Sequence, residues 1–231
     1  MQKPDMLENN LRIMEVVEKE LNRRKGEATF CFSVFLAATS VWVMLVELWR
    51  LLGKPIPLPK MTYGVEIIAI LMFILTQTKT KLKLKDLGFG FKNIKTSLIR
   101  AGIISAVVAA VMLAAKIFVK PGAPGTPFFD WSRTDPFYPL TSILQEFLAR
   151  GFLLTCLMSI YDTEKKKHIS VILSSLLFTA LHLQYGFLFM VGAGILSVIL
   201  GYVYIKDENI WGVSIIHFVF GTLGSALALA A

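Results

Sequence analysis

Long runs of apolar residues, separated by short polar stretches, dominate the pattern along this chain. Seven runs stand out, at residues 29–52, 63–78, 98–119, 138–160, 169–186, 187–205 and 211–231. A helix of about 20 apolar residues spans the hydrocarbon core of a bilayer, whereas a half-buried strand would alternate apolar and polar residues. The pattern therefore predicts an all-α, polytopic transmembrane helical bundle of about seven spans.

The N-terminal segment combines spaced apolar residues with many charged ones. Its apolar positions are Leu7, Leu11, Ile13, Met14, Val17 and Leu21. This spacing is typical of an amphipathic helix, and we expect one over residues 1–28, lying on the membrane or on the body of the protein. No cleavable signal peptide is expected there. Residues 29–137 then form accessory transmembrane helices and loops, and residues 138–231 form a motif-bearing transmembrane core.

Composition and charge agree with a membrane location. Hydrophobic residues make up 55% of the chain and charged residues only 17%, against about 25% in a soluble domain. The net charge is +8, and most Lys and Arg residues fall in the N-terminal segment and the loops at 79–100 and 161–168. Lys and Arg mark cytoplasmic loops, so we expect a cytoplasmic N-terminus. No basic face carries base-reading groups, so no nucleic-acid partner is expected.

One loop and one set of polar residues suggest function. The loop at 120–137 is rich in Pro, Gly and aromatic residues, so it should be irregular, and its aromatic side chains could sit at the membrane interface or cover an entrance. The polar set is Glu146, Arg150, His182 and His217, all inside predicted spans. A charge at the centre of a membrane helix costs about 2.5–3.5 kcal/mol on insertion scales, so each needs a partner or a function.

These side chains can be explained separately or together. Glu146 and Arg150 are four residues apart, so they share a helix face and can form a structural ion pair. Each histidine alone could be a buried residue bonded to a carbonyl. Together, Glu146, His182 and His217 could hold zinc, or a carboxylate–imidazole pair could activate a water. The residue types leave both chemistries open.

Three short motifs carry a family resemblance. They read Gln145-Glu146-Phe147-Leu148-Ala149-Arg150-Gly151, Phe178-Thr179-Ala180-Leu181-His182 and His217-Phe218-Val219-Phe220-Gly221. Residues 138–225 resemble the CPBP family in the order of the three motifs, in the spacing within each motif and in the location of the motifs in apolar runs. This family comprises CAAX prenyl endopeptidases of the type II class and their bacteriocin-processing and abortive-infection relatives. The resemblance implies an intramembrane endopeptidase of a bacterial or archaeal cell membrane. Its expected partners are membrane lipid and a membrane-associated peptide or CAAX-type lipidated tail.

The resemblance also implies roles for the motif residues. In the family, the first glutamate of motif one and the first histidine activate a water, while the second histidine and a later asparagine stabilise the oxyanion. Carried over to this chain, His182 would hold the water and His217 would donate to the oxyanion. Glu146 would pair with Arg150.

Two positions depart from the family pattern. Gln145 stands where the water-activating glutamate is usual, and an amide cannot accept a proton from water at neutral pH. Gly221 stands where the asparagine is usual, and loss of one oxyanion donor typically costs about 10²–10³ in rate. Three hypotheses follow. Glu146 takes over as base in an active enzyme, or the chain is a catalytically impaired scaffold, regulator or bacteriocin-immunity factor, or Gln145 is an inactivating substitution of a natural glutamate.

A small transporter or channel is a further alternative, which broken spans with inverted repeats would favour; the sequence shows no internal repeat.

Straight helices would place His182 and His217 at levels that differ by roughly 10 Å. A shared site therefore requires a tilted or broken helix, or an inward dip of residues 206–212. We predict a water-filled cavity where the three motifs meet.

Overall fold

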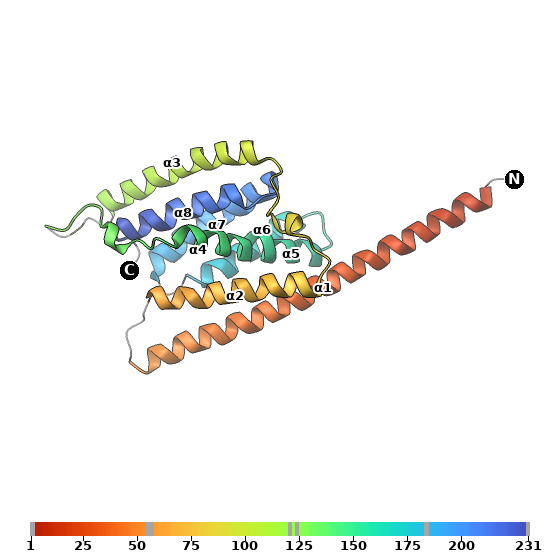
Figure 1. Cartoon of the computed structure of the whole chain (residues 1–231), viewed down its shortest axis with the longest axis horizontal. Helices are drawn as coiled ribbons and strands as arrows, with labels where there is room; N and C mark the ends of the chain where they lie inside the picture. Colours follow the sequence, from red (N-terminus) through yellow and green to blue (C-terminus); the bar gives the residue numbers. More distant parts are fainter. Residues whose placement is uncertain (1–2, 54–57, 120–121, 123–124, 183–184, 230–231) are drawn as a thin grey trace.

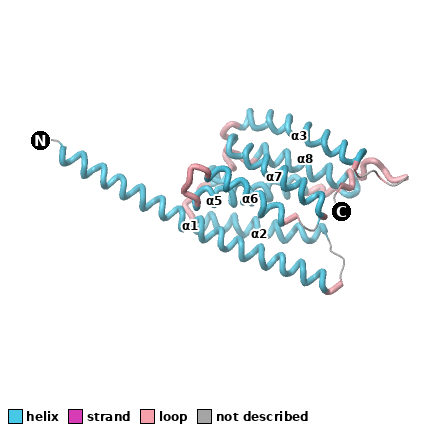
Figure 2. The backbone as a smooth tube through the Cα atoms, turned by 180° about the vertical axis from the view of Figure 1, so that it is seen from behind, coloured by secondary structure: helices cyan, strands magenta, loops and turns pink. Residues whose placement is uncertain are grey.

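Helices account for nearly all of the regular secondary structure among the described residues. The computed structural model describes residues 3–53, 58–119, 122, 125–182 and 185–229. Within these residues there is no β-strand, as Figure 2 shows. The long helices pack side by side, with the connections at the two ends of the bundle (Figure 1). The predicted all-α bundle is confirmed.

Among the described residues, the bundle consists of eight α-helices and three shorter helical segments. The α-helices are α1 (Lys3–Leu51), α2 (Leu58–Lys79), α3 (Ile94–Phe118), α4 (Tyr138–Glu146), α5 (Thr155–Ile160), α6 (Lys166–Ala180), α7 (Phe187–Asp207) and α8 (Trp211–Ala226). The 3₁₀ helices are η1 (Leu84–Leu87) and η2 (Trp131–Arg133), and the π-helical segment is η3 (Phe147–Leu154). Because η3 directly joins α4 to α5, these three form one continuous helix.

Each predicted apolar run coincides with a helix. Four helical stretches are long and apolar enough to cross a membrane, namely Glu8–Leu51, Ile94–Phe118, Tyr138–Ile160 and Phe189–Asp207. Helix α8 is apolar but shorter, and α6 has 15 residues. A helix of that length is shorter than the hydrocarbon core, so it depends on its neighbours to cover its polar ends.

Helix α1 differs from the expected N-terminal arrangement. Its 49 residues form one helix, about 73 Å long, instead of an amphipathic helix followed by a separate span. No proline interrupts it, and ion pairs one turn apart, such as Arg12 with Glu8 and Arg24 with Glu20, run along its polar half. This half projects away from the bundle (Figures 1 and 2), and Met14 is 67% exposed there.

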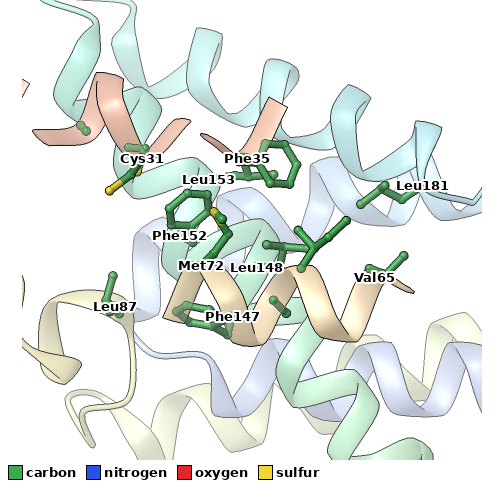
Figure 3. Close-up of a cluster of buried hydrophobic side chains, with 14 residues drawn as sticks. Cys31, Phe35, Val65, Met72, Leu87, Phe147, Leu148, Phe152, Leu153 and Leu181 are labelled. Carbon is green, nitrogen blue, oxygen red and sulfur yellow. The ribbon is translucent and has the colours of Figure 1, made fainter. Parts of the chain in front are cut away.

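Two apolar cores flank the π-helical segment η3. One contains Cys31 and Phe35 of α1, Met72 of α2, and Phe147 and Phe152 of η3 (Figure 3). The other joins η3 to α6, α7 and α8 through Leu154, Val171, Leu200 and Ile216. All eight residues of η3 are buried. The continuous helix from α4 to α5 is therefore the central element of the bundle.

The connection between α7 and α8 is buried beneath the segment that precedes α3. The Ile210 amide donates to the Gly88 carbonyl (2.9 Å), and the Asn209 side chain donates to the Lys92 carbonyl (2.8 Å). Asp207 forms an ion pair with Arg100 of α3. Gly88 has φ 85°, a left-handed conformation that glycine adopts without strain. These contacts fix the start of α8, the helix that carries His217.

Candidate active site

The carboxylate of Glu146 lies at the centre of the polar cluster. Glu146 is the last residue of α4 and is fully buried. Its Oε1 atom accepts hydrogen bonds from Arg150 Nη1 (2.8 Å) and from His217 Nδ1 (2.7 Å). A buried carboxylate is stable only where cations and donors surround it. Glu146 therefore links its own helix to α8 as well as to Arg150.

Arg150 ties three helices together. It lies in η3, is 2% exposed, and donates from Nη2 to the Ser197 carbonyl (2.8 Å) and hydroxyl (2.9 Å) of α7. Its guanidinium also lies 5.2 Å from the ring centre of Phe178 of α6, a cation–π distance. The planar guanidinium can satisfy several partners at once, which a lysine ammonium cannot do with the same geometry. Arg150 is a structural brace around Glu146.

His217 has a defined hydrogen-bond direction. A carboxylate only accepts hydrogen bonds, so Nδ1 of His217 carries the proton that it donates to Glu146. In the neutral ring, Nε2 then carries the lone pair and can act as a base. The ring packs edge-on against Tyr138 (6.1 Å between centres) and Phe178 (5.6 Å).

His182 is oriented in the same manner. It lies in the turn just after α6, and its Nδ1 is 2.9 Å from the carbonyl oxygen of Phe178. A carbonyl also only accepts, so the neutral His182 ring likewise keeps its lone pair on Nε2. The two histidines of the motifs therefore each offer a basic Nε2 atom, held by a hydrogen bond on the other nitrogen.

The structure brings the two histidines to one small cavity. Its volume is about 10 Å³, and His182, His217, Tyr138, Phe178 and Ser197 are among its lining residues. A space of that size holds about one water. The hydrogen bond from His217 to Glu146 shows that the third motif reaches the level of the first without a break in α8, and the shared cavity places the second motif beside the third.

Two buried oxygens near this cluster have no hydrogen-bond partner among the described residues. They are Glu146 Oε2 and Gln145 Oε1. Buried polar oxygens in proteins are nearly always hydrogen-bonded, so both atoms have capacity to accept from a water or a substrate N–H. Gln145 itself does not line the cavity, although it is buried on the turn of α4 beside it.

Tyr138 occupies the space beside Gly221. A Cβ atom built at Gly221 would overlap the phenol ring and hydroxyl of Tyr138. The family asparagine at this position would therefore collide with Tyr138, which is itself one of the residues that line the cavity. The motifs gave no signal for Tyr138, because it lies outside them at the start of α4.

Glu66 is a second carboxylate within a predicted apolar run, and the sequence analysis missed it. It is half-buried on α2, and its Oε1 accepts a hydrogen bond from the Thr141 hydroxyl of α4 (2.9 Å). Thr141 lies one turn from both Tyr138 and Gln145. A signal was present, since Glu66 is the one acidic residue in the apolar run 63–78.

The described residues do not form the zinc site that was one of the two possibilities. None of them make a group of three or more His, Cys, Asp or Glu side chains placed to hold a metal ion. Glu146 binds His217 directly, whereas zinc needs both side chains turned toward a common point, with three protein ligands at a catalytic centre. The proposed mechanism therefore uses no metal.

The loop before α4 lies at the cavity end of the bundle, and its described residues 122 and 125–137 are irregular, as predicted, apart from η2. Its Asp130 amide donates to the carbonyl of Ala226 at the end of α8 (2.7 Å). Hydrogen bonds from Ser132 and then Arg133 hold the pKa of Asp130 below its usual value. The rings of Phe129 and Trp131 stack at 5.7 Å in the same loop.

Comparison with known proteins finds a match in the part of the chain that holds this cluster. Residues 136–223 match the family model described as type II CAAX prenyl endopeptidase Rce1-like. The match contains all three motifs and leaves α1, α2 and α3 outside. No curated protein and no solved structure matches the chain.

Proposed function

Because residues 136–223 form an Rce1-like domain of the type II CAAX prenyl endopeptidase family, we propose that this membrane protein is an intramembrane endopeptidase. One observation carries the proposal. A buried carboxylate, Glu146, holds His217 by a 2.7 Å hydrogen bond, and His217 shares a cavity with His182. The proposed substrate is a membrane-associated peptide or a CAAX-type lipidated tail.

In the proposed reaction, His217 is the general base and Glu146 orients it. His182 Nε2 accepts one hydrogen of a water, and His217 Nε2 takes the other proton as the water oxygen attacks the scissile carbonyl carbon. Glu146 holds the correct tautomer and stabilises the imidazolium that forms, as the carboxylate of a catalytic triad does. The imidazolium then gives its proton to the leaving nitrogen as the C–N bond breaks.

This assignment differs from the roles that the family resemblance implies. A neutral His217 bonded to Glu146 through Nδ1 has no hydrogen on Nε2, so it cannot donate to an oxyanion at the start of the reaction. After it has accepted the proton from water, the same atom becomes a donor. Glu146 acts through His217, which supplies the base that Gln145 cannot.

A second candidate function is a non-catalytic relative that binds a membrane partner. Three observations favour it: the amide of Gln145, the filling of the space at Gly221 by Tyr138, and a cavity of only about 10 Å³. A substrate peptide must then displace side chains to reach His217. Such a protein would be a scaffold, a regulator or an immunity factor.

Cleavage assays with matched histidine variants distinguish these functions. The purified chain in proteoliposomes is incubated with a fluorescent transmembrane peptide and, separately, with a farnesylated CAAX tail. We expect cleavage that His217→Ala reduces by about 10²–10⁴, the usual effect of a general base. His168→Ala is the control, since His168 is exposed and bonded to Tyr202 away from the cavity.

The outcomes separate the two candidates. Cleavage that survives both His182→Ala and His217→Ala contradicts the proposed site. Cleavage that appears only after Gln145→Glu, and not in the unaltered chain, supports the impaired relative. If His168→Ala loses as much activity as His217→Ala, the loss reflects unfolding instead of chemistry.

A further inference from the structure

A second and larger cavity lies at the other end of the bundle from the histidines. Its volume is about 300 Å³, and it forms where α1 leaves the bundle. Tyr138 of the first cavity and Ser159 of this one stand near opposite ends of the continuous helix from α4 to α5. None of the residues proposed for catalysis lines it.

The walls of this cavity come from three parts of the chain. They are Arg23, Arg24, Glu27 and Ala28 of α1, Thr80, Lys81, Leu82 and Asp86 of the segment after α2, and Thr155, Cys156 and Ser159 of α5. Along α1, the N-terminal charged stretch ends at Glu27, and no further charged residue follows before Glu47. This change marks the level at which a membrane helix passes from water into lipid. The cavity therefore lies at the height of lipid headgroups.

The acidic groups of the cavity already have partners. Glu27 forms an ion pair with Arg23 and accepts a hydrogen bond from the Lys81 amide (3.3 Å). Asp86 accepts from the Lys83 amide (2.9 Å), which caps η1. The carboxylates therefore hold the walls together and are not available to bind a cationic ligand.

Two cationic groups keep free donors. Arg24 is 62% exposed and uses only its Nε atom, toward Glu20 (3.1 Å), so both of its terminal nitrogens are unpaired among the described residues. The Lys81 ammonium group is exposed and likewise has no partner in the described part of the chain. The hydroxyls of Thr155 and Ser159 donate to backbone carbonyls of their own helix. The hydrogen-bond donors that remain free therefore belong to cationic groups, which favour the binding of an anion.

We propose that this cavity binds the phosphate group of an anionic phospholipid. Arg24 and Lys81 bind the phosphate oxygens, which a guanidinium and an ammonium both recognise well. Ala28, Leu82 and the buried Cys156 form an apolar wall for the glycerol and the first acyl carbons. Clusters of basic residues at the cytoplasmic ends of membrane helices bind anionic headgroups in this way. The headgroup would anchor α1 to α5 at the point where α1 leaves the bundle.

Lipid binding to the full chain tests the proposal. The purified protein is titrated with phosphatidylglycerol, with phosphatidylcholine of the same acyl chains, and with inorganic phosphate alone. Native mass spectrometry records retained ligand, and thermal unfolding records stabilisation. We expect phosphatidylglycerol to be retained and to stabilise, and the pair Arg24→Gln with Lys81→Gln to weaken its binding about thirtyfold, at about 1 kcal/mol per charge.

A matched variant separates the cavity from the general positive field. Arg12→Gln with Lys19→Gln removes the same charge from the projecting half of α1 and should leave binding unchanged. Equal losses in both double variants would overturn the proposal, as would equal retention of phosphatidylglycerol and phosphatidylcholine. Stabilisation by inorganic phosphate equal to that by the lipid would replace the lipid with a soluble phosphate ligand.

Discussion

At the scale of single residues, the pair Gly221 and Tyr138 gives a sharp test of the packing around the cavity. Gly221→Ala should destabilise the protein by about 1–3 kcal/mol, because its Cβ would overlap the ring of Tyr138. Gly102→Ala is the matched control on α3, where a Cβ would have nothing within 4 Å. That control should be neutral or stabilising by up to about 1 kcal/mol. Thermal unfolding in detergent measures both.

The double variant Gly221→Ala with Tyr138→Ala completes this test. Removal of the ring opens the space that the new methyl group needs, so the added cost of Gly221→Ala should vanish in that background. If Gly221→Ala alone is as stable as Gly102→Ala, Tyr138 does not fill the place of the family asparagine.

Sequence spacing predicted some contacts of the cluster but not its central hydrogen bond. Glu146 and Arg150 could be paired because residues four apart share a helix face. The bond between Glu146 and His217 joins residues 71 positions apart, and no local pattern predicts the relative level of α4 and α8. The partner of Glu66 could not be predicted for a similar reason, because Thr141 lies 75 positions away.

At the scale of elements, the connection between α7 and α8 sets the position of His217. Asn209→Ala should lower the free energy of unfolding by about 1–3 kcal/mol, because it removes the donor to the Lys92 carbonyl and the acceptor of the buried Ser97 hydroxyl. Asn22→Ala, on the exposed half of α1, is the control and should change stability little. The measurement is the denaturation midpoint in detergent.

A second readout links this element to the site. Asn209 contacts no cavity residue, so Asn209→Ala should reduce the proposed peptide cleavage only through the position of α8. Unchanged stability in Asn209→Ala would show that the buried connection does not hold α8 in place.

The same connection and α1 show what apolar patterns can and cannot predict about elements. The runs located the helices because a bilayer demands about 20 apolar residues of each span. They could not predict that α1 would continue as one helix of 49 residues, because its continuity depends on favourable neighbours one turn apart and on the lack of proline beyond the first turn, and neither feature is part of an apolar pattern. Nor could they predict the buried 207–210 turn, which depends on the partner segment at 88–93.

At the scale of the whole molecule, the two cavities and the loop charges define an orientation. The larger cavity and the lysines at 165–167 lie at one end of the bundle, and the smaller cavity and the loop before α4 lie at the other. Basic loops remain in the cytoplasm, so we expect the histidine cavity to open toward the opposite side of the membrane.

Cysteine labelling in intact cells measures this orientation. A membrane-impermeant maleimide should label Ser132→Cys, before α4, and should label Glu164→Cys, between α5 and α6, only after the cells are opened. Both positions are exposed, while the native Cys31 and Cys156 are buried and give little background. Labelling of Glu164→Cys in intact cells would reverse the orientation. The proposed protease would then meet its substrate from the cytoplasm, and the phosphate cavity would face the outer leaflet.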